Sequence, residues 1–138
     1  MDERRAVVGI FCDDVRNEIG NKFTLVGCYG PDMLLASFPA VLPKLGILAR
    51  AITPADHPFQ KLTLRLWLNS DLLGEVDVPL SEATKASEKP TDTKWLSVQA
   101  VMLASPVLLQ GPGEFRLEAD TEEGAVRGSK LRARLMDD

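Results

Sequence analysis

The 138-residue chain contains a single histidine and only two cysteines, and this scarcity limits the catalytic and metal-binding sites that it can form. Cys12 and Cys28 are too few for a disulfide scaffold or for a zinc site built from thiolates. His57 directly follows Asp56, and adjacent side chains usually point apart, so we do not interpret the pair as a catalytic dyad. A Ser–His–Asp triad therefore lacks its base. We expect a protein that is not an enzyme and that holds neither a metal ion nor a cofactor.

The chain also lacks a long run of basic residues. It has 16 basic and 20 acidic residues, a formal net charge of −4, and same-sign runs as short as Arg4 with Arg5 or Asp13 with Asp14. Proteins that bind phosphate backbones usually carry a stripe of Lys and Arg that replaces condensed counterions. We therefore expect no nucleic-acid partner.

Long hydrophobic runs are missing as well. The apolar run after Arg5 is short and ends at Asp13, which is not the pattern of a secretory signal. Residues 98–109 are very apolar, but the segment is too short to cross a bilayer and contains Pro106. We expect no membrane association and a cytoplasmic location.

The dominant pattern in the sequence is an alternation of apolar and polar residues with a period of two. In residues 60–69, Leu62, Leu64, Leu66 and Leu68 fall on one face of an extended chain, which predicts a half-buried strand. Turn residues follow at 69–71, so residues 74–79 complete a hairpin. Further strands are predicted at residues 114–120, 130–136 and 95–109, the last bent or interrupted at Pro106.

Three predicted strands in the N-terminal third are apolar on both faces. They are residues 6–12, 23–29 and 44–52, the last with Arg50 as its only charge after Lys44. Such strands either lie mid-sheet with both faces covered or present one face to a partner. A turn at residues 18–22 would bring Cys12 opposite Cys28. A bridge there would close a loop of about 15 residues, but for a reducing cytosol we expect two buried free thiols.

About eight strands separated by short turns predict an all-β fold, a two-layer antiparallel β-sandwich that forms a single domain over residues 1–138. A small barrel is the alternative. One stretch departs from the strand pattern: residues 81–89, which begin with a serine and precede Pro90, predict either a short surface helix or a loop.

The densest polar cluster follows the first predicted strand. Carboxylate pairs can bind divalent ions or perform acid–base chemistry. If Asp13 and Asp14 continue that strand, however, they project to opposite faces and cannot share one ion without a bend. The simpler interpretation is a hairpin end in which Arg16 pairs with a carboxylate. Outside this cluster, Trp67 lies on the polar face of its strand, where it either covers the edge of the sandwich or marks an interface.

The same cluster carries a family resemblance. Residues 11–16 (F-C-D-D-V-R), 18–20 (E-I-G), Lys22 and 25–30 (L-V-G-C-Y-G) resemble the opening of a family of uncharacterised small bacterial and phage proteins, known as a domain of unknown function. Residues 113–117 (G-E-F-R-L) and the Glu-Gly turn after them fit the same layout. The resemblance implies a bacterial or phage source and a β-sandwich, and it implies no activity. It directs attention to Asp13, Asp14, Arg16, Glu18 and Lys22.

Two functional hypotheses follow. The first is a non-catalytic interaction module that binds a protein partner or itself through the apolar N-terminal strands or the face with Trp67. The second is binding of a small molecule or an ion at the hairpin end formed by residues 13–22. A concave pocket around the polar cluster would favour the second hypothesis, and a flat, solvated hairpin would favour the first.

Overall fold

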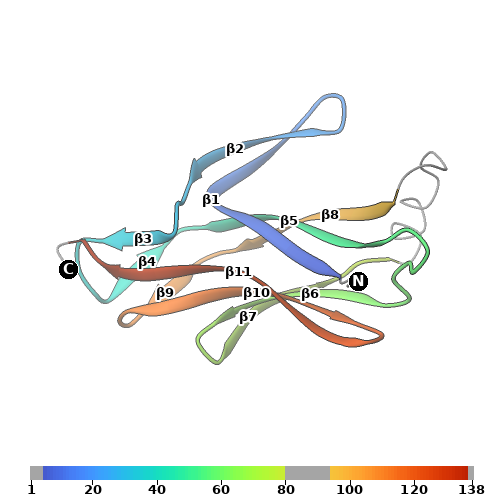
Figure 1. Ribbon diagram of the computed structural model, residues 1–138. Helices are drawn as coiled ribbons and strands as arrows, with labels where there is room; N and C mark the ends of the chain where they lie inside the picture. The colour runs from blue at the N-terminus through green and yellow to red at the C-terminus, as the bar shows by residue number, and fades with distance from the viewer. Residues whose placement is uncertain (1–4, 80–93, 137–138) are drawn as a thin grey trace.

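The computed structural model describes residues 5–79 and 94–136, and every regular element within these ranges is a β-strand (Figure 1). Residues 81–89, for which a short helix or a loop is predicted, lie outside the described residues. The strands are β1 (Ala6–Glu18), β2 (Lys22–Cys28), β3 (Asp32–Leu35), β4 (Ala40–Leu42), β5 (Leu45–Pro54), β6 (Leu62–Leu68), β7 (Asp71–Asp77), β8 (Trp95–Ala104), β9 (Val107–Leu109), β10 (Gly113–Thr121) and β11 (Gly124–Leu135).

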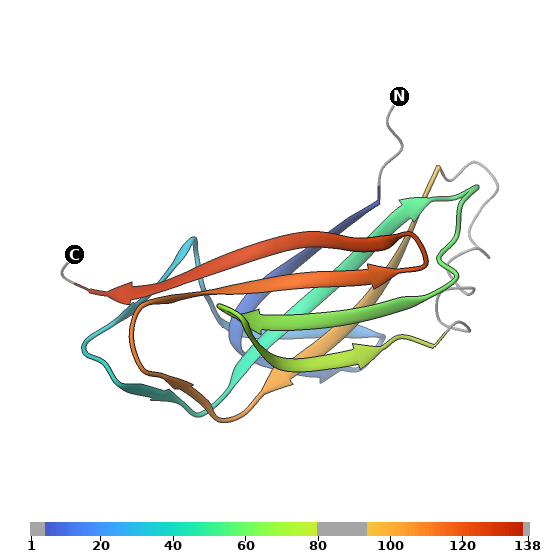
Figure 2. The same cartoon turned by 90° about the horizontal axis from the view of Figure 1, so that it is seen from below.

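The strands form two packed layers, which confirms the predicted β-sandwich (Figure 2). One layer is a four-stranded antiparallel sheet in the order β2-β1-β5-β8. The other has the order β3-β11-β10-β6-β7 and is antiparallel except where β3 pairs parallel with β11. The short strands β4 and β9 form a separate two-stranded sheet. Within the described ranges, no helix has the length and hydrophobicity needed to span a bilayer.

The described residues contain eleven strands where the sequence predicts about eight. Ser105 and Pro106, joined by a cis peptide bond, separate β8 from β9, so the predicted interruption at Pro106 is confirmed. Strands β3 and β4 are not predicted, because segments of four and three residues are too short for alternation to be recognised.

The core lies between the two large sheets. All four leucines of β6 are buried, as their alternation predicts, and they pack with Phe115 and Leu117 of β10. The opposing sheet contributes alternate residues of β1 and β5, such as Val7, Phe11 and Ile47. Alternate burial on these strands leaves their other apolar residues pointing away from the core.

The sheets approach each other closely where β1 meets β11. The backbone N–H of Gly9 donates to Ser129 Oγ at 3.0 Å. A Cβ atom at Gly128 would lie 2.6 Å from the carbonyl oxygen of Val7, so only glycine fits this position.

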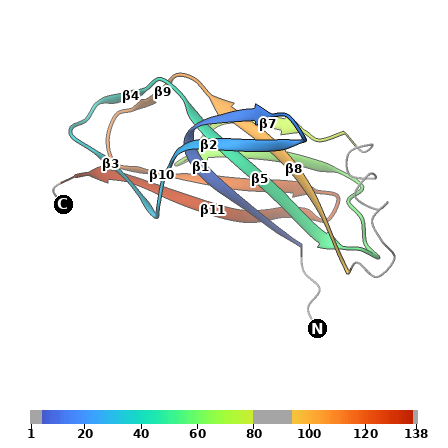
Figure 3. The ribbon, with the colours of Figure 1, turned by 90° about the horizontal axis from the view of Figure 1, so that it is seen from above.

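β1 is a long strand with two partners. Residues 6–12 pair with β5, and residues 12–18 pair with β2, so the far half of β1 and all of β2 form a hairpin. The connecting turn has Gly20 and Asn21 at positive φ, which suits a tight hairpin. We call residues 12–28 the arm. In Figures 1 and 3 the arm stands over the side of the four-stranded sheet that faces away from the five-stranded sheet.

Candidate functional site

The outer face of the four-stranded sheet is the main exposed apolar surface that the N-terminal strands produce. Val8 and Ile10 of β1 are each 47% exposed, and Leu103 of β8 is 54% exposed. Their chain neighbours Val7, Phe11 and Met102 are buried in the core. The two-sided apolar pattern therefore has a structural explanation, since one side of each strand fills the core and the other meets solvent.

Strand register arranges this face in rows. Ile10 lies opposite Leu48, which lies opposite Val101, and the next row is Val8, Arg50 and Gln99. Arg50 makes no hydrogen bond or ion pair with any residue in the described part of the chain. Arg50, which has no partner among the described residues, thus lies between the apolar Val8 and the polar Gln99. We call Val8, Ile10, Leu48, Arg50, Gln99, Val101 and Leu103 the outer face.

The outer face is hollowed, not flat. A central depression is lined by Val8, Gly9, Ile10, Leu48, Arg50 and Gln99. Arg50 also lines a second depression with Ile52 and Trp95, and Gln99 lines a third with the tip of the arm. Because they share lining residues, the three depressions adjoin one another along the sheet. An extended chain with alternating side chains would fit such a surface.

The arm approaches this surface at its root. A Cβ atom at Gly46 would lie 3.2 Å from Leu103 and 3.3 Å from Val15, so both side chains lie over the backbone of β5 at this point. At the other end, Glu18 and Lys22 line the third depression opposite Gln99. These are the two predicted site residues that the structure brings into the neighbourhood of the outer face.

The remaining members of the predicted polar cluster have separate partners. Asp13 accepts a hydrogen bond of 2.7 Å from the Tyr29 hydroxyl. Asp14 accepts one of 3.0 Å from Lys44 and lies 3.8 Å from Arg16, so the predicted pairing of Arg16 with a carboxylate is confirmed.

The three carboxylates of this cluster each have a hydrogen-bond donor of their own. The hydrogen bond from Lys44 lowers the pKa of Asp14 from its ordinary value. Burial, together with the hydrogen bond to Asp13, raises the pKa of Tyr29 to about 12. Glu18 accepts from Thr24 Oγ1 at 2.7 Å. The carboxylates therefore do not converge on one point where an ion or a small molecule would bind.

Trp67 lies on the outward side of the other sheet. It is half-buried, and its Nε1 donates to Glu118 at 3.0 Å. The Arg116 guanidinium lies 6.0 Å from the centroid of the Trp67 ring. These contacts explain why Trp67 lies among polar residues of β6 and β10. Its predicted role at an interface stays a prediction.

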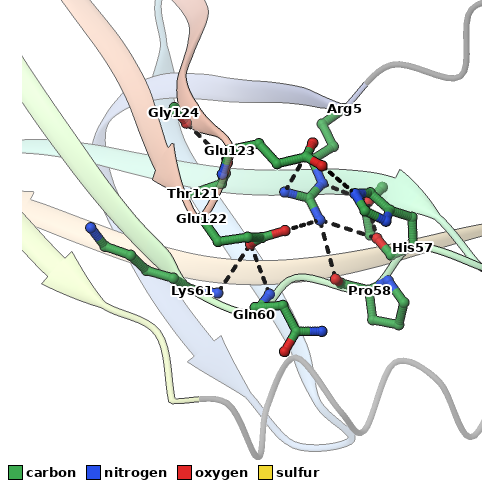
Figure 4. A network of polar contacts seen from close by, with 10 residues as sticks. Arg5, His57, Pro58, Gln60, Lys61, Thr121, Glu122, Glu123 and Gly124 are labelled. Carbon is green, nitrogen blue, oxygen red and sulfur yellow. Dashed lines mark hydrogen bonds and ion pairs between the residues drawn. The ribbon is translucent and has the colours of Figure 1, made fainter.

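Sequence reasoning missed a polar network that links Arg5, the loop between β5 and β6, and the β10–β11 turn (Figure 4). Arg5, 5% exposed in its side chain, donates to Thr53 and to the carbonyl oxygens of His57 and Pro58, and pairs with Glu122 at 2.6 Å. Its guanidinium also lies 4.6 Å from the Phe59 ring centroid. No motif marks this network, because its members are far apart in the chain.

The network includes a set of potential metal ligands. One atom each of His57, Glu122 and Glu123 lie within 4.8 Å of one another. Glu122, however, also accepts from the backbone N–H groups of Gln60 and Lys61, and His57 Nε2 lies 2.6 Å from Glu123. With the Arg5 cation against Glu122 as well, the carboxylates already have partners. We interpret the network as structural: it links Arg5, next to β1, to the loop after β5 and to the β10–β11 turn.

The comparison with known proteins agrees with the resemblance seen in the sequence. No curated protein matches the chain. A family model, described as a family of unknown function (DUF6941), matches residues 7–134, which include nearly all of both large sheets and the arm. The chain therefore belongs to this family of unknown function, DUF6941.

Proposed function

We propose that the protein is a non-catalytic interaction module whose outer face binds an extended segment of a partner protein. The observation that carries this proposal is the exposure of Val8, Ile10 and Leu103 on the same face as Arg50, which has no partner within the described ranges. Contiguous exposed apolar surface with a polar rim is typical of protein interaction sites. The arm adds a second wall to this surface at its tip.

Arg50 indicates the chemistry of the partner. Arg50 is exposed between the half-buried Leu48 and Ile52 on β5, and a carboxylate brought against its guanidinium would form a charge-assisted hydrogen bond. The apolar residues in the neighbouring row would accept apolar side chains on either side of that carboxylate. The partner segment is therefore expected to carry an acidic residue between apolar residues.

A second copy of this chain fits the face less well. A two-fold axis through the central row would place two Arg50 side chains near each other, and like charges on an apolar surface repel. Binding of an ion or a small molecule at residues 13–22 is also less favoured, because Asp13, Asp14 and Glu18 each have a different partner. No described serine or cysteine donates to His57, which gives no support to an enzymatic role.

Selection from a displayed library of random peptides tests the proposal. The wild-type protein is expected to enrich peptides with an acidic residue between apolar ones. Val8→Lys and Ile10→Lys, tested singly, are each expected to lower the affinity for the selected peptides by about tenfold or more. The reason is that each substitution places an ammonium group in the apolar face. Arg50→Glu is expected to change the preference from acidic to basic peptides.

Leu72→Lys provides the matched control. Leu72 is 44% exposed on β7 of the other sheet, so its substitution should leave peptide affinity unchanged. Peptides that bind wild type, Val8→Lys and Ile10→Lys equally would overturn the assignment of the outer face.

A further inference from the structure

The two cysteines meet at the root of the arm. Cys12 of β1 is the direct partner of Cys28 of β2, as the sequence predicts. The Tyr29 N–H donates to the Phe11 carbonyl at 2.9 Å, which identifies Cys12 and Cys28 as a non-hydrogen-bonded pair. In such pairs the Cα atoms are about 4.5 Å apart and the side chains share a face. That separation is within the range of disulfides, about 4.4–6.8 Å.

The two thiols have different environments. Cys12 is fully buried, and its Sγ donates to the carbonyl oxygens of Asp14 at 3.3 Å and Gly46 at 3.6 Å. Burial raises the pKa of the Cys12 thiol, and the neighbouring Cys28 adds to the rise. Cys28 is exposed, so the expectation that both thiols are buried is wrong for this residue. It is exposed because β2 forms the edge of its sheet.

We propose that Cys12 and Cys28 form a reversible thiol switch, which a small disulfide such as glutathione disulfide converts into a cross-strand disulfide at the root of the arm. The exposed Cys28 is the thiol that an external disulfide reaches, and the buried Cys12 is the thiol that resolves the intermediate. This inference is independent of the proposed binding function, because it rests on the pairing of β1 with β2 and on the environments of the two thiols.

The chemistry proceeds in two exchanges. The Cys28 thiolate attacks one sulfur of glutathione disulfide, forms a mixed disulfide and releases one glutathione thiolate. Cys12 then attacks the Cys28 sulfur, so that the Cys12–Cys28 bond forms, and the second glutathione leaves as a thiolate that takes up the Cys12 proton. The two cysteines lose two electrons and two protons, and one glutathione disulfide becomes two glutathione molecules.

The fold is expected to favour this product. A bridge between these positions closes a loop of about 15 residues, and the fold already holds the loop ends together. By linkage, the equilibrium constant for disulfide formation should be about a hundredfold larger in the folded chain than in the unfolded chain.

The experiment incubates the full chain in a series of glutathione/glutathione disulfide buffers, with and without urea. Each sample is quenched with acid, the free thiols are alkylated, and the intact mass is measured without reduction. Wild type is expected to lose both free thiols, to retain no glutathione, and to recover both thiols in excess reduced glutathione. The midpoint glutathione ratio is expected to shift about a hundredfold between folded and unfolded chain.

Single substitutions separate the two roles. Cys12→Ser should retain one glutathione on Cys28, because nothing resolves the mixed disulfide. Cys28→Ser should keep Cys12 reduced under the same conditions, because Cys12 is buried. A stable mixed disulfide in folded wild type, or a midpoint no more favourable in the folded than in the unfolded chain, would overturn the proposal.

Discussion

At the scale of single residues, Arg5 shows how one buried charge can join distant segments. Its guanidinium contacts β5 through Thr53, the following loop through two carbonyl oxygens, and the β10–β11 turn through Glu122. A buried cation that loses its anionic partner is costly, because its desolvation is no longer compensated. The contribution of Glu122 to stability should therefore depend on its ionisation.

Glu122 gives the first prediction, which concerns pH. Desolvation raises the pKa of Glu122, but the hydrogen bonds from Arg5 and the Gln60 N–H outweigh it and lower the pKa from 4.5 to about 2. A depressed pKa stabilises the fold above the unfolded value of 4.5, and this stability is lost as the pH falls toward about 2. Allowing for solvent screening, wild type should lose about 1–2 kcal/mol more than Glu122→Gln between about pH 5.5 and about pH 2.5.

Urea unfolding at both pH values measures this difference. Asp56→Asn, which removes an exposed carboxylate two positions before Pro58, serves as the control and should follow wild type. Equal losses in wild type and Glu122→Gln would show that Arg5 gains no stability from this carboxylate.

At the scale of elements, the crossing of β1 and β11 sets the distance between the sheets. Gly128→Ala is expected to destabilise the protein by about 1–3 kcal/mol, because the new methyl group would lie 2.6 Å from the Val7 carbonyl oxygen and would push the strands apart. Thermal and urea unfolding measure the change. Gly74→Ala on β7 is the matched control, since nothing lies within 4 Å of its Cβ position, and it should be nearly neutral. If Gly128→Ala left the free energy of unfolding unchanged, β1 would have to move away from the new methyl group without an energetic cost.

The elements also show how far the sequence predicts the structure. Alternation predicts β6, β10 and the pairing of Cys12 with Cys28, because these depend on local period and one short turn. It does not predict β3, which is held by parallel pairing with β11 about a hundred positions away in the chain. Nor does it predict the Arg5 network, since long-range contacts leave no local pattern.

The candidate site is likewise predicted only in part. The two-sided apolar pattern predicts strands that either lie mid-sheet with both faces covered or present one face to a partner. The structure shows that Val8, Ile10 and Leu48 share one outward side of β1 and β5. The polar cluster at residues 13–22 is conspicuous in the sequence, but its side chains divide among Tyr29, Lys44 and Thr24. Sequence proximity on a strand does not make carboxylates converge, because successive side chains point to opposite faces.

At the scale of the whole molecule, the outer face leads to a prediction about solution mass. The free chain is expected to be a monomer at micromolar concentration, because its net charge of −4 opposes association and a symmetric contact would bring two Arg50 side chains together. Light scattering coupled to size-exclusion chromatography measures this mass. Ile10→Lys should leave it unchanged.

A dimer that Ile10→Lys dissociates would instead assign the outer face to a second copy of the chain. The same experiment on Arg50→Glu distinguishes the reasons for the monomer. If repulsion between Arg50 side chains were the only barrier to self-association, then Arg50→Glu should remain monomeric too, and an equimolar mixture of wild type and Arg50→Glu should form a heterodimer. If the face instead requires an extended partner segment, the mixture should elute as two monomers, because two hollowed sheets do not fill each other's depressions. We expect the second result.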